Sequence, residues 1–469
     1  MPRTVHSSCV SSASARSRYG RLAAVVLFLL ATGQLNAAEE SSGLRVGAAA
    51  AVLEADDSMV IGGSIGPGKS VGQEGELRAV AVVLEKEPFG RFAIVACDVL
   101  FVSRDQMDLA AAEIERTCGI APGHLLVNAT HTHHAPSTVL VHGAFPDETF
   151  RRRVTEGVVK AVQEATKNLV DDCRFTFQLT EEKTIGQNSR MLLSDDSIYW
   201  IGPRDDAIRP TGPIDPELPL LAFRRADDHL LAVIYNHSCH TIGTRTPGAR
   251  SPSFYGLAAQ ELEPVLGATV CFLEGASGST HNYGMLDGVP VAKAVERLKE
   301  VIRTGLDETQ PRPVERLAAQ KRPFRFKVRT FDEAKEDATI YAYCERRVPA
   351  GSKIILETFR KQREQIAPEQ GRERETWLQV MLIGDVAIVG VPAELFTGLG
   401  LEIKRRSPLK NTYVAELAND TIGYLPNLEG HKLGGYQTWT GLHSYAEPGT
   451  GERIVDEAVA MLNELVKAD

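Results

Sequence analysis

The chain has 469 residues and a net charge of −9 at pH 7, with a hydrophobic fraction of 43%. This length suffices for a sizeable core in one large domain or two ordinary ones. The acidic balance argues against nucleic acid as the main partner and provides no basic face for anionic lipid.

The N-terminal segment has the pattern of an export signal. Arginines precede an apolar run over residues 22–33, and small residues follow it. This order is typical of a cleaved secretory signal, and the run is shorter than the roughly 20 residues of a membrane span. We therefore predict a signal peptide over residues 1–38 and a secreted or periplasmic protein with no integral membrane span after signal removal. The alternative is a retained N-terminal anchor.

Seven cysteines are present, and Cys9 leaves with the predicted signal. The others show no CxxC spacing, which argues against a cysteine zinc site. Export permits disulfides, but Cys97, Cys239 and Cys271 lie in apolar runs where free buried thiols are equally natural. The sequence leaves the pairing open.

The elements predicted first along the chain form a strand–helix–strand unit. An ordered stretch covers residues 43–54, and a loop rich in glycine and serine follows it. Residues 92–101 and 124–132 are short apolar runs of buried-strand type, with a segment of helical spacing between them. Such a unit makes two parallel strands with a right-handed crossover. It would bring Asp98 and His131 to the carboxyl ends of neighbouring strands, where sites collect in open α/β sheets.

The remaining elements continue the alternation of strands and helices and indicate an α/β protein with no internal repeat. Residues 310–375 are charged and irregular, and we predict an insertion or subdomain there within a single domain over residues 39–469. The other predicted elements are a helix at 149–169, strands within 229–240 and 267–282, a helix at 291–305, two strands within 377–394, and a closing helix at 452–468.

Three histidines crowd into the stretch NATHTHHAP, residues 128–136. In an extended chain, side chains two positions apart share a face, so His131 and His133 would point into one pocket while His134 points away. Zinc prefers imidazole nitrogen, and catalytic zinc sites keep one coordination position open. The stretch is therefore a candidate metal site, with a polar loop as the alternative.

Other strand ends offer further ligands for a metal. His237 and His240 follow one apolar strand, and Glu394 directly follows another. The alternative role for Glu394 is a favourable charge at the start of the helix that comes next. Asp98 is either an outer partner that orients a ligating imidazole or a carboxylate that caps nearby amides.

Four segments, in the same order along the chain, resemble those of the neutral/alkaline non-lysosomal ceramidases. NATHTHHAP is similar to their GTHTHSGP segment, NHSCH to their second histidine segment, VPAELFT to PGEFT, and NDTIGYLPNLEGHKLGGYQTW to their C-terminal tyrosine segment. The resemblance implies a ceramidase-type catalytic domain built from mixed β-sheets with flanking helices, and zinc-dependent amidase activity.

The resemblance also implies the ligands of a Zn²⁺ ion, namely His131, His240, Glu394 and Tyr424. Zinc lowers the pKa of a bound water to about 7 and polarises a carbonyl group. A phenol such as that of Tyr424 can ligate the ion or stabilise an oxyanion.

Catalytic roles follow from the same resemblance. His133 becomes a proton carrier, Arg190 occupies the place of a substrate-site arginine, and Tyr436 that of a further active-site tyrosine. The alternative for Tyr436 is a half-buried aromatic ring with a hydrogen-bonded hydroxyl. The family segment GDVSPN reads GASGSTHN here, so Ser279 falls at its aspartate and His281 at its serine. A serine nucleophile is therefore not expected, and His281 either assists in the pocket or fills the altered loop.

These patterns together predict a zinc-dependent hydrolase that cleaves an amide bond, in an N-acyl lipid such as ceramide or in another N-acylated substrate such as a sugar. The immunoglobulin-like C-terminal domain of well-known ceramidases has no counterpart in the sequence, which weakens the expectation of a membrane-borne lipid substrate. The alternatives are a metal-dependent esterase or deacetylase acting on an O-acylated carbohydrate, and a non-catalytic binding protein on the same fold.

Overall fold

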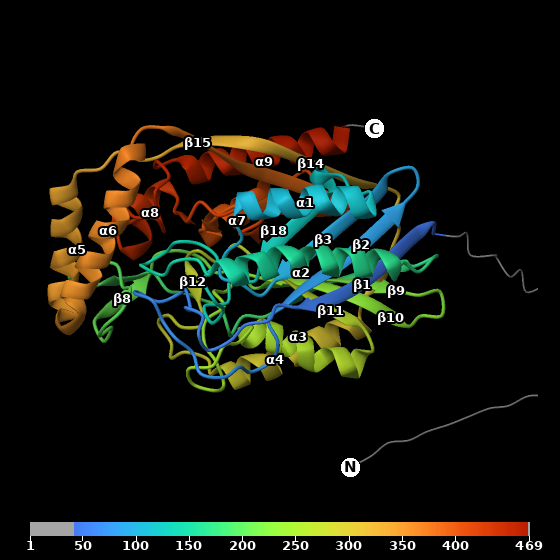
Figure 1. The fold of residues 1–469 in the computed structure, drawn as a ribbon, viewed down its shortest axis with the longest axis horizontal. Coiled ribbons are helices and arrows are strands. Elements are labelled where there is room, and N and C mark those ends of the chain that lie inside the picture. The colour runs from blue at the N-terminus through green and yellow to red at the C-terminus, as the bar shows by residue number, and fades with distance from the viewer. Residues whose placement is uncertain (1–41, 468–469) are drawn as a thin grey trace, which may run out of the picture. The chain divides into compact units, whose positions relative to one another are not determined.

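The computed structural model describes residues 42–467, which belong to one compact unit. The predicted signal peptide lies outside the described residues. Among the helices of the described part, none has the length and apolar character needed to cross a bilayer. The fold is a mixed α/β arrangement of sheets with helices packed against them (Figure 1), which confirms the predicted fold class.

One sheet topology occurs three times. Each time, four neighbouring strands form two antiparallel pairings and then one parallel pairing. The first sheet contains β1 (Leu44–Val52), β2 (Arg78–Lys86), β3 (Gly90–Cys97) and β4 (Leu125–Ala129). The second contains β5 (Arg174–Glu181), β9 (Glu217–Arg224), β10 (Leu230–His237) and β11 (Thr269–Glu274), with β13 (Gln310–Arg312) beside β5. The third contains β14 (Leu317–Lys327), β15 (Glu373–Ile383), β16 (Val386–Val391) and β18 (Asn411–Glu416).

This structural repeat differs from the sequence prediction, which found none. Buried strands require apolar residues of about the right size but no particular side chain. The three units therefore share a topology without a sequence period that can be recognised.

A helix connects the two parallel strands of each sheet, because parallel neighbours require a crossover connection. These helices are α1 (Arg104–Cys118), α3 (Ser253–Leu266) and α7 (Thr397–Arg406), and each unit ends in a further helix, namely α2 (Glu148–Lys167), α4 (Val291–Asp307) or α9 (Thr450–Lys467). The predicted unit of two strands around a helix is thus confirmed. Strands β3 and β4 pair in parallel, and α1 connects them.

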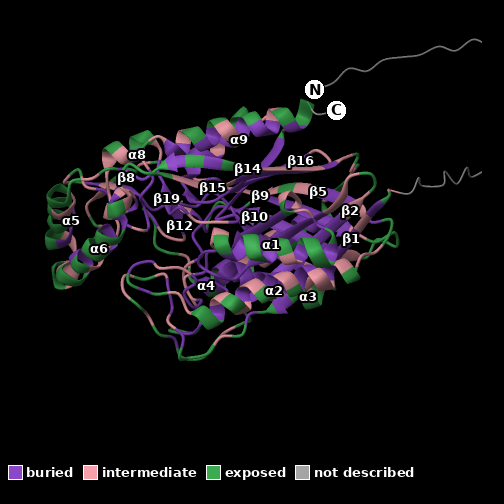
Figure 2. Ribbon diagram, turned by 45° about the horizontal axis from the view of Figure 1, so that its top comes forward, coloured by how far each residue is buried: buried purple, intermediate pink, exposed green. Residues whose placement is uncertain are grey.

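Strands β2, β16 and β18 are buried on both faces along most or all of their length. The inner faces of the three sheets enclose a shared core that includes Val82, Phe223 and Ile388, one from each sheet. The outer faces pack against the helices, as the buried strands and exposed outer helix surfaces in Figure 2 illustrate. Burial on both faces explains why these strands are continuous apolar runs in the sequence.

The segments between the first and second strand of each sheet build the surroundings of the candidate site. The first is the loop of residues 53–77, and the second includes β6 (Gln187–Asn188), β7 (Met191–Leu193) and β8 (Ala207–Pro210). The third holds the helices α5 (Glu333–Arg347) and α6 (Ser352–Ile366). Helices α5 and α6 lie beside β8 at one end of the unit (Figure 1). Within the residues predicted as an insertion, 310–375, β14 is part of the third sheet, and α5 and α6 lie between β14 and β15.

Short strand pairs position the last parts of the site. Strand β17 (Glu394–Leu395) pairs in parallel with β19 (Tyr424–Leu425), so that Glu394 lies opposite Tyr424. Strand β12 (Thr280–His281) pairs with β6, and α8 (Leu428–Leu433) follows β19.

All six cysteines of the described part are buried free thiols. Burial raises the pKa of the Cys271 thiol to about 12. Thiols in such apolar surroundings are inert, because only the thiolate is a nucleophile.

The N-terminus of α2 offers a direct test of local stability. The Asp147 carboxylate accepts a hydrogen bond from the Phe150 amide at 2.8 Å, which satisfies a helix amide that has no partner inside the helix. Replacing Asp147 by alanine is expected to lower the free energy of unfolding by about 1 kcal/mol. Chemical denaturation measures this loss, and Asp147→Asn, which keeps the cap, is the control. Equal stability of the two variants would contradict the capping role.

Candidate metal centre

Side chains from all three sheets meet at one point. His131 follows β4 of the first sheet, and His240 follows β10 of the second. Glu394 begins β17, shortly after β16 of the third sheet ends at Val391, and Tyr424 lies opposite it on β19. The carboxyl ends of parallel strands are where α/β proteins place ligand sites, and here three such ends face one another.

The potential ligand atoms of these side chains are separated by distances that suit a single metal ion. The Nε2 atoms of His131 and His240 lie 3.0 Å apart. Glu394 Oε2 lies 3.4 Å from the first and 3.3 Å from the second, and the Tyr424 hydroxyl lies 3.0 Å from His240 Nε2. Tetrahedral zinc with bonds of about 2.0–2.2 Å separates its ligand atoms by about 3.3–3.6 Å. The donor set is therefore compatible with one bound metal ion.

The hydrogen bonds of both imidazoles leave the facing nitrogens without a hydrogen. Nδ1 of His131 donates to the Leu100 carbonyl at 3.0 Å, and Nδ1 of His240 donates to the Ser277 carbonyl at 3.0 Å. Such bonds fix the tautomer of metal-ligating histidines. The two Nε2 lone pairs then face each other at 3.0 Å, an arrangement that repels unless a cation lies between them.

The carboxylate of Glu394 supplies a buried negative charge beside the two imidazoles. Burial by itself raises the pKa of Glu394, but positive charge beside the carboxylate, carried by His131 and His240 when those rings are protonated, outweighs burial and holds the pKa well below its usual range. Burial, and then the Glu394 charge, raises the pKa of Tyr424 well above its usual value. A buried carboxylate is costly unless it is paired or coordinates a metal. A cation bound among these donors would remove that cost.

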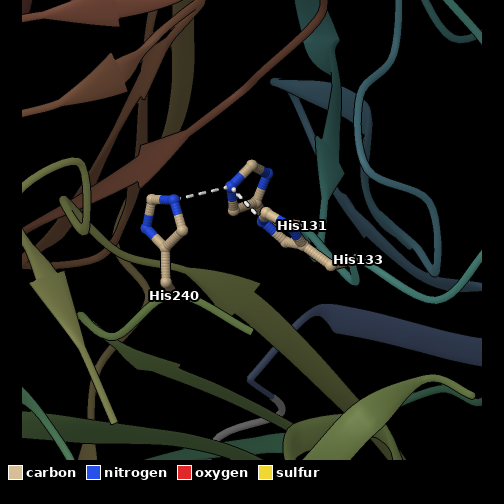
Figure 3. Close-up of side chains that lie close together, drawn as sticks. All are labelled: His131, His133 and His240. Atoms are coloured by element: carbon tan, nitrogen blue, oxygen red, sulfur yellow. Dashed lines mark hydrogen bonds between the residues drawn. The ribbon is translucent and has the colours of Figure 1, made fainter. Parts of the chain in front are cut away.

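The backbone at His131 departs from the extended form assumed in the sequence prediction. Strand β4 ends at Ala129, and His131 has φ of +60°, in the left-handed region that non-glycine residues seldom occupy. His131 and His133 nevertheless converge, with 3.2 Å between their Nε2 atoms (Figure 3). His134 is not part of this histidine group, although it borders the neighbouring cavity. Its Nε2 accepts a hydrogen bond from the Gly243 amide at 2.8 Å.

His133 presents a third imidazole to the same point. Its Nδ1 donates to the Gly63 carbonyl at 2.7 Å, which leaves Nε2 free to accept a proton or bind a metal. Burial, followed by the neighbouring His131 and His240, lowers the pKa of His133 well below its usual value, so that the ring is neutral. Ligand atoms of His131, His133 and His240 all lie within 4.8 Å of one another. The geometry thus accommodates His133 as a base or as a ligand.

Two sequence candidates lie away from the donor set. Asp98 accepts hydrogen bonds from the Arg78 amide at 2.9 Å and the Thr130 hydroxyl at 3.1 Å. It therefore caps a backbone amide and does not contact an imidazole of the donor set. The Leu100 carbonyl orients His131 in its place. His237 is enclosed between the Tyr255 hydroxyl and the Glu182 carbonyl.

A buried carboxyl group behind the site was missed by the sequence prediction. Glu416 accepts hydrogen bonds from the hydroxyl and the amide of Ser277 and from the Leu395 amide, at 2.7, 3.0 and 2.8 Å. It thereby braces the segments that hold His240 and Glu394. Its position at the end of β18 is the same signal that identified Glu394 at the end of β16.

A cavity of about 480 Å³ opens beside the donor set. It is lined by His133 and Tyr424 from the candidate centre, by Ile65 from the loop of residues 53–77, by Trp200 from the segment between β7 and β8, and by Tyr436. The Tyr436 ring stacks on Trp200, with 4.5 Å between ring centroids and an angle of 1°. Cavities of this volume bind small molecules or parts of larger ones.

Arg190 contacts the segment that carries Tyr436. Its guanidinium donates to the Gln437 side chain at 2.7 Å and to the carbonyls of Gly430 and Gly434 at 3.2 and 2.6 Å. The side chain is 1% exposed, and burial lowers its pKa to about 9. Through these hydrogen bonds the Arg190 guanidinium holds the segment of residues 430–437 in place beside the cavity.

The altered glycine-rich loop contributes a histidine to the cavity. His281 lines it and stacks on His240 at 4.2 Å, and its Nδ1 has no partner among the described residues. Ser279 is buried, and its hydroxyl is engaged with the amide and hydroxyl of Thr397, each at 3.1 Å. This hydroxyl is thus occupied within the protein.

Comparisons with known proteins place this fold among the ceramidases. No family model matches the sequence, and no curated protein matches it. A crystal structure of neutral ceramidase from Pseudomonas aeruginosa is similar with a TM-score of 0.68 and 18% sequence identity, covering 90% of this chain and 75% of that one. A ceramidase complexed with C2 is similar with a TM-score of 0.70 and 17% identity, covering 91% and 75%. The chain therefore has the fold of the neutral ceramidases, as the four sequence segments indicated.

Proposed function

We propose that the protein is an exported, zinc-dependent hydrolase that cleaves the amide bond of an N-acyl substrate. The observation that carries this proposal is the donor set at the cavity, in which the Nε2 atoms of His131 and His240 lie within 3.4 Å of the Glu394 carboxylate and His240 Nε2 lies 3.0 Å from the Tyr424 hydroxyl. The similarity to structures of ceramidases, enzymes of amide hydrolysis by their name, supports the choice of bond.

The ligands in this proposal are His131, His240, Glu394 and Tyr424. Bound zinc would supply a nucleophilic water near neutral pH and polarise the substrate carbonyl. His133 would then accept a proton at its free Nε2 and return it to the departing amine, the role of a general base and acid.

The remaining cavity residues bind and orient the substrate in this proposal. The Tyr436 hydroxyl would donate a hydrogen bond to the carbonyl oxygen as negative charge develops on it. His281 borders the same cavity and would contact the substrate, whereas Arg190 would fix the loop that carries Tyr436. The substrate is a ceramide-like lipid or another N-acylated compound such as a sugar.

Metal analysis and paired assays test the proposal. Purified protein is expected to contain about one zinc per chain, as a catalytic site of this type holds. Removal of zinc by a chelator is expected to abolish hydrolysis of N-acyl substrates, and added zinc to restore it. Assays on matched N-acyl and O-acyl compounds measure the preferred bond. Faster turnover of the esters would favour a deacetylase, and the absence of turnover with intact ligand binding would favour a binding protein.

A further inference from the structure

A histidine that no sequence segment pointed to contacts Tyr436. The Nε2 atom of His142 lies 2.8 Å from the Tyr436 hydroxyl, and its Nδ1 lies 3.1 Å from the side-chain nitrogen of Gln362. His142 follows β4 of the first sheet, Gln362 lies on the inserted helix α6, and Tyr436 begins a short 3-10 helix after α8. Three distant parts of the chain therefore meet at one imidazole beside the cavity.

The His142 contacts are buried and are held in an unusual backbone conformation. His142 is 6% exposed and Gln362 is 2% exposed. His142 has φ of +49°, a conformation that costs energy for a residue with a side chain and tends to occur at functional sites. The ring also packs against His443 at 5.0 Å and Phe359 at 5.9 Å, which restrict its rotation.

The direction of the hydrogen bonds follows from the chemistry of the groups. The Gln362 side-chain nitrogen can only donate, so His142 Nδ1 accepts and carries no hydrogen. Burial lowers the pKa of His142 to about 4, against an opposing effect of Glu394, so the ring is neutral near pH 7. The single ring hydrogen therefore resides on Nε2 and is donated to the Tyr436 oxygen.

This arrangement determines what Tyr436 offers to the cavity. Its oxygen already accepts a hydrogen bond from His142, and its own hydrogen remains free to donate to a ligand. With the opposite tautomer, the phenolic hydrogen would go to His142 and only oxygen lone pairs would face the cavity. Those lone pairs would repel a carbonyl oxygen that acquires negative charge.

We propose that His142 is a positioning residue for amide hydrolysis: Gln362 holds it in the tautomer with hydrogen on Nε2, and it directs the Tyr436 hydroxyl hydrogen toward the substrate carbonyl oxygen. This inference rests on the proposed function, and it adds His142 and Gln362 to the residues on which turnover depends. The effect belongs to the transition state, where the charge on oxygen is largest, so it should appear in kcat more than in KM.

Kinetics of His142→Phe test the proposal. This variant keeps an aromatic ring but removes both nitrogens, and kcat is expected to fall about 10- to 100-fold with KM changed less than about threefold, since loss of an oxyanion donor itself costs about 10²–10³ in kcat. Gln362→Met, which removes only the donor to Nδ1, is expected to show a smaller loss of the same kind. Zinc content and the thermal unfolding midpoint show that each variant is folded.

A double-mutant cycle separates positioning from a purely structural role. If His142 acts through Tyr436, adding His142→Phe to Tyr436→Phe should cost no further activity, because residues that act as a unit are not additive. Losses that multiply, or a change confined to KM, would overturn the proposal.

Nitrogen NMR of histidine-labelled protein provides a readout that does not depend on activity. The signals that disappear in His142→Phe are expected to show hydrogen on Nε2 and none on Nδ1, and Gln362→Met should shift them toward a mixture of tautomers. Hydrogen on Nδ1 in the unaltered protein would overturn this inference alone. Failure of the unaltered, zinc-loaded protein to hydrolyse any N-acyl compound would instead contradict the proposed function, and the catalytic role of His142 with it.

Discussion

Replacing His131 by alanine is expected to remove most of the bound zinc and to lower kcat/KM by about 10³-fold or more. The Nε2 atom of His131 lies within 3.4 Å of both His240 Nε2 and Glu394 Oε2, so its loss opens the donor set on one side. A metal ion contributes several kcal/mol of transition-state stabilisation, and each 1.4 kcal/mol changes the rate about tenfold. Zinc analysis and steady-state kinetics measure the two effects.

The control for His131→Ala is His229→Ala, which removes an exposed imidazole at the opposite end of β10 from His240. It should retain zinc and turnover.

Zinc should also raise the thermal unfolding midpoint of the unaltered protein, since a ligand that binds the folded state stabilises it. This shift should be lost in His131→Ala. A His131→Ala protein that keeps stoichiometric zinc and full turnover would refute the proposed centre.

Replacing His133 by alanine is expected to leave zinc bound while kcat falls by about 10²–10⁴-fold, the usual contribution of a general acid or base. His133 Nε2 is free because Nδ1 donates to the Gly63 carbonyl, and the ring lines the cavity. Kinetics and metal analysis on one preparation measure both quantities, and added imidazole should restore part of the activity.

Loss of zinc from His133→Ala, to the extent seen for His131→Ala, would contradict this role. It would show that the ion is bound by three imidazoles. These would be His131, His133 and His240, whose potential ligand atoms lie within 4.8 Å of one another. The comparison therefore decides between Tyr424 and His133 as the fourth protein ligand beside His131, His240 and Glu394.

The strand ends were the most informative feature of the sequence. His240 and Glu394 were selected because each follows an apolar strand, and the structure brings both to His131. Strands buried on both faces are recognisable as apolar runs, so their ends could be located in the sequence. The meeting of strand ends from three different sheets follows from the packing of those sheets around one core. Position at a strand end did not distinguish His240 from His237. The structure places His237 at the last position of β10, where its ring contacts the Tyr255 hydroxyl and not the donor set.

Local spacing was less informative than strand position. The assumption of an extended chain through residues 131–134 was wrong because His131 takes a left-handed conformation. The carbonyls that fix the tautomers belong to Leu100, Ser277 and Gly63, and no pattern of side chains identifies a backbone acceptor. Contacts such as His142 with Tyr436 join residues 294 positions apart, beyond the reach of any periodicity.

The sequence by itself determined several of the strands and helices and which ligand types lie at the strand ends, because apolar spacing and side-chain chemistry are local properties. It did not identify α5 and α6, whose segment is charged and lacks a clear apolar period. The tertiary structure alone decided that one topology is used three times, which imidazoles meet, and which nitrogen of each ring faces the others. Those outcomes depend on how three sheets pack around a shared core. Packing of this kind is set by the sum of many long-range contacts and by no single stretch of the chain.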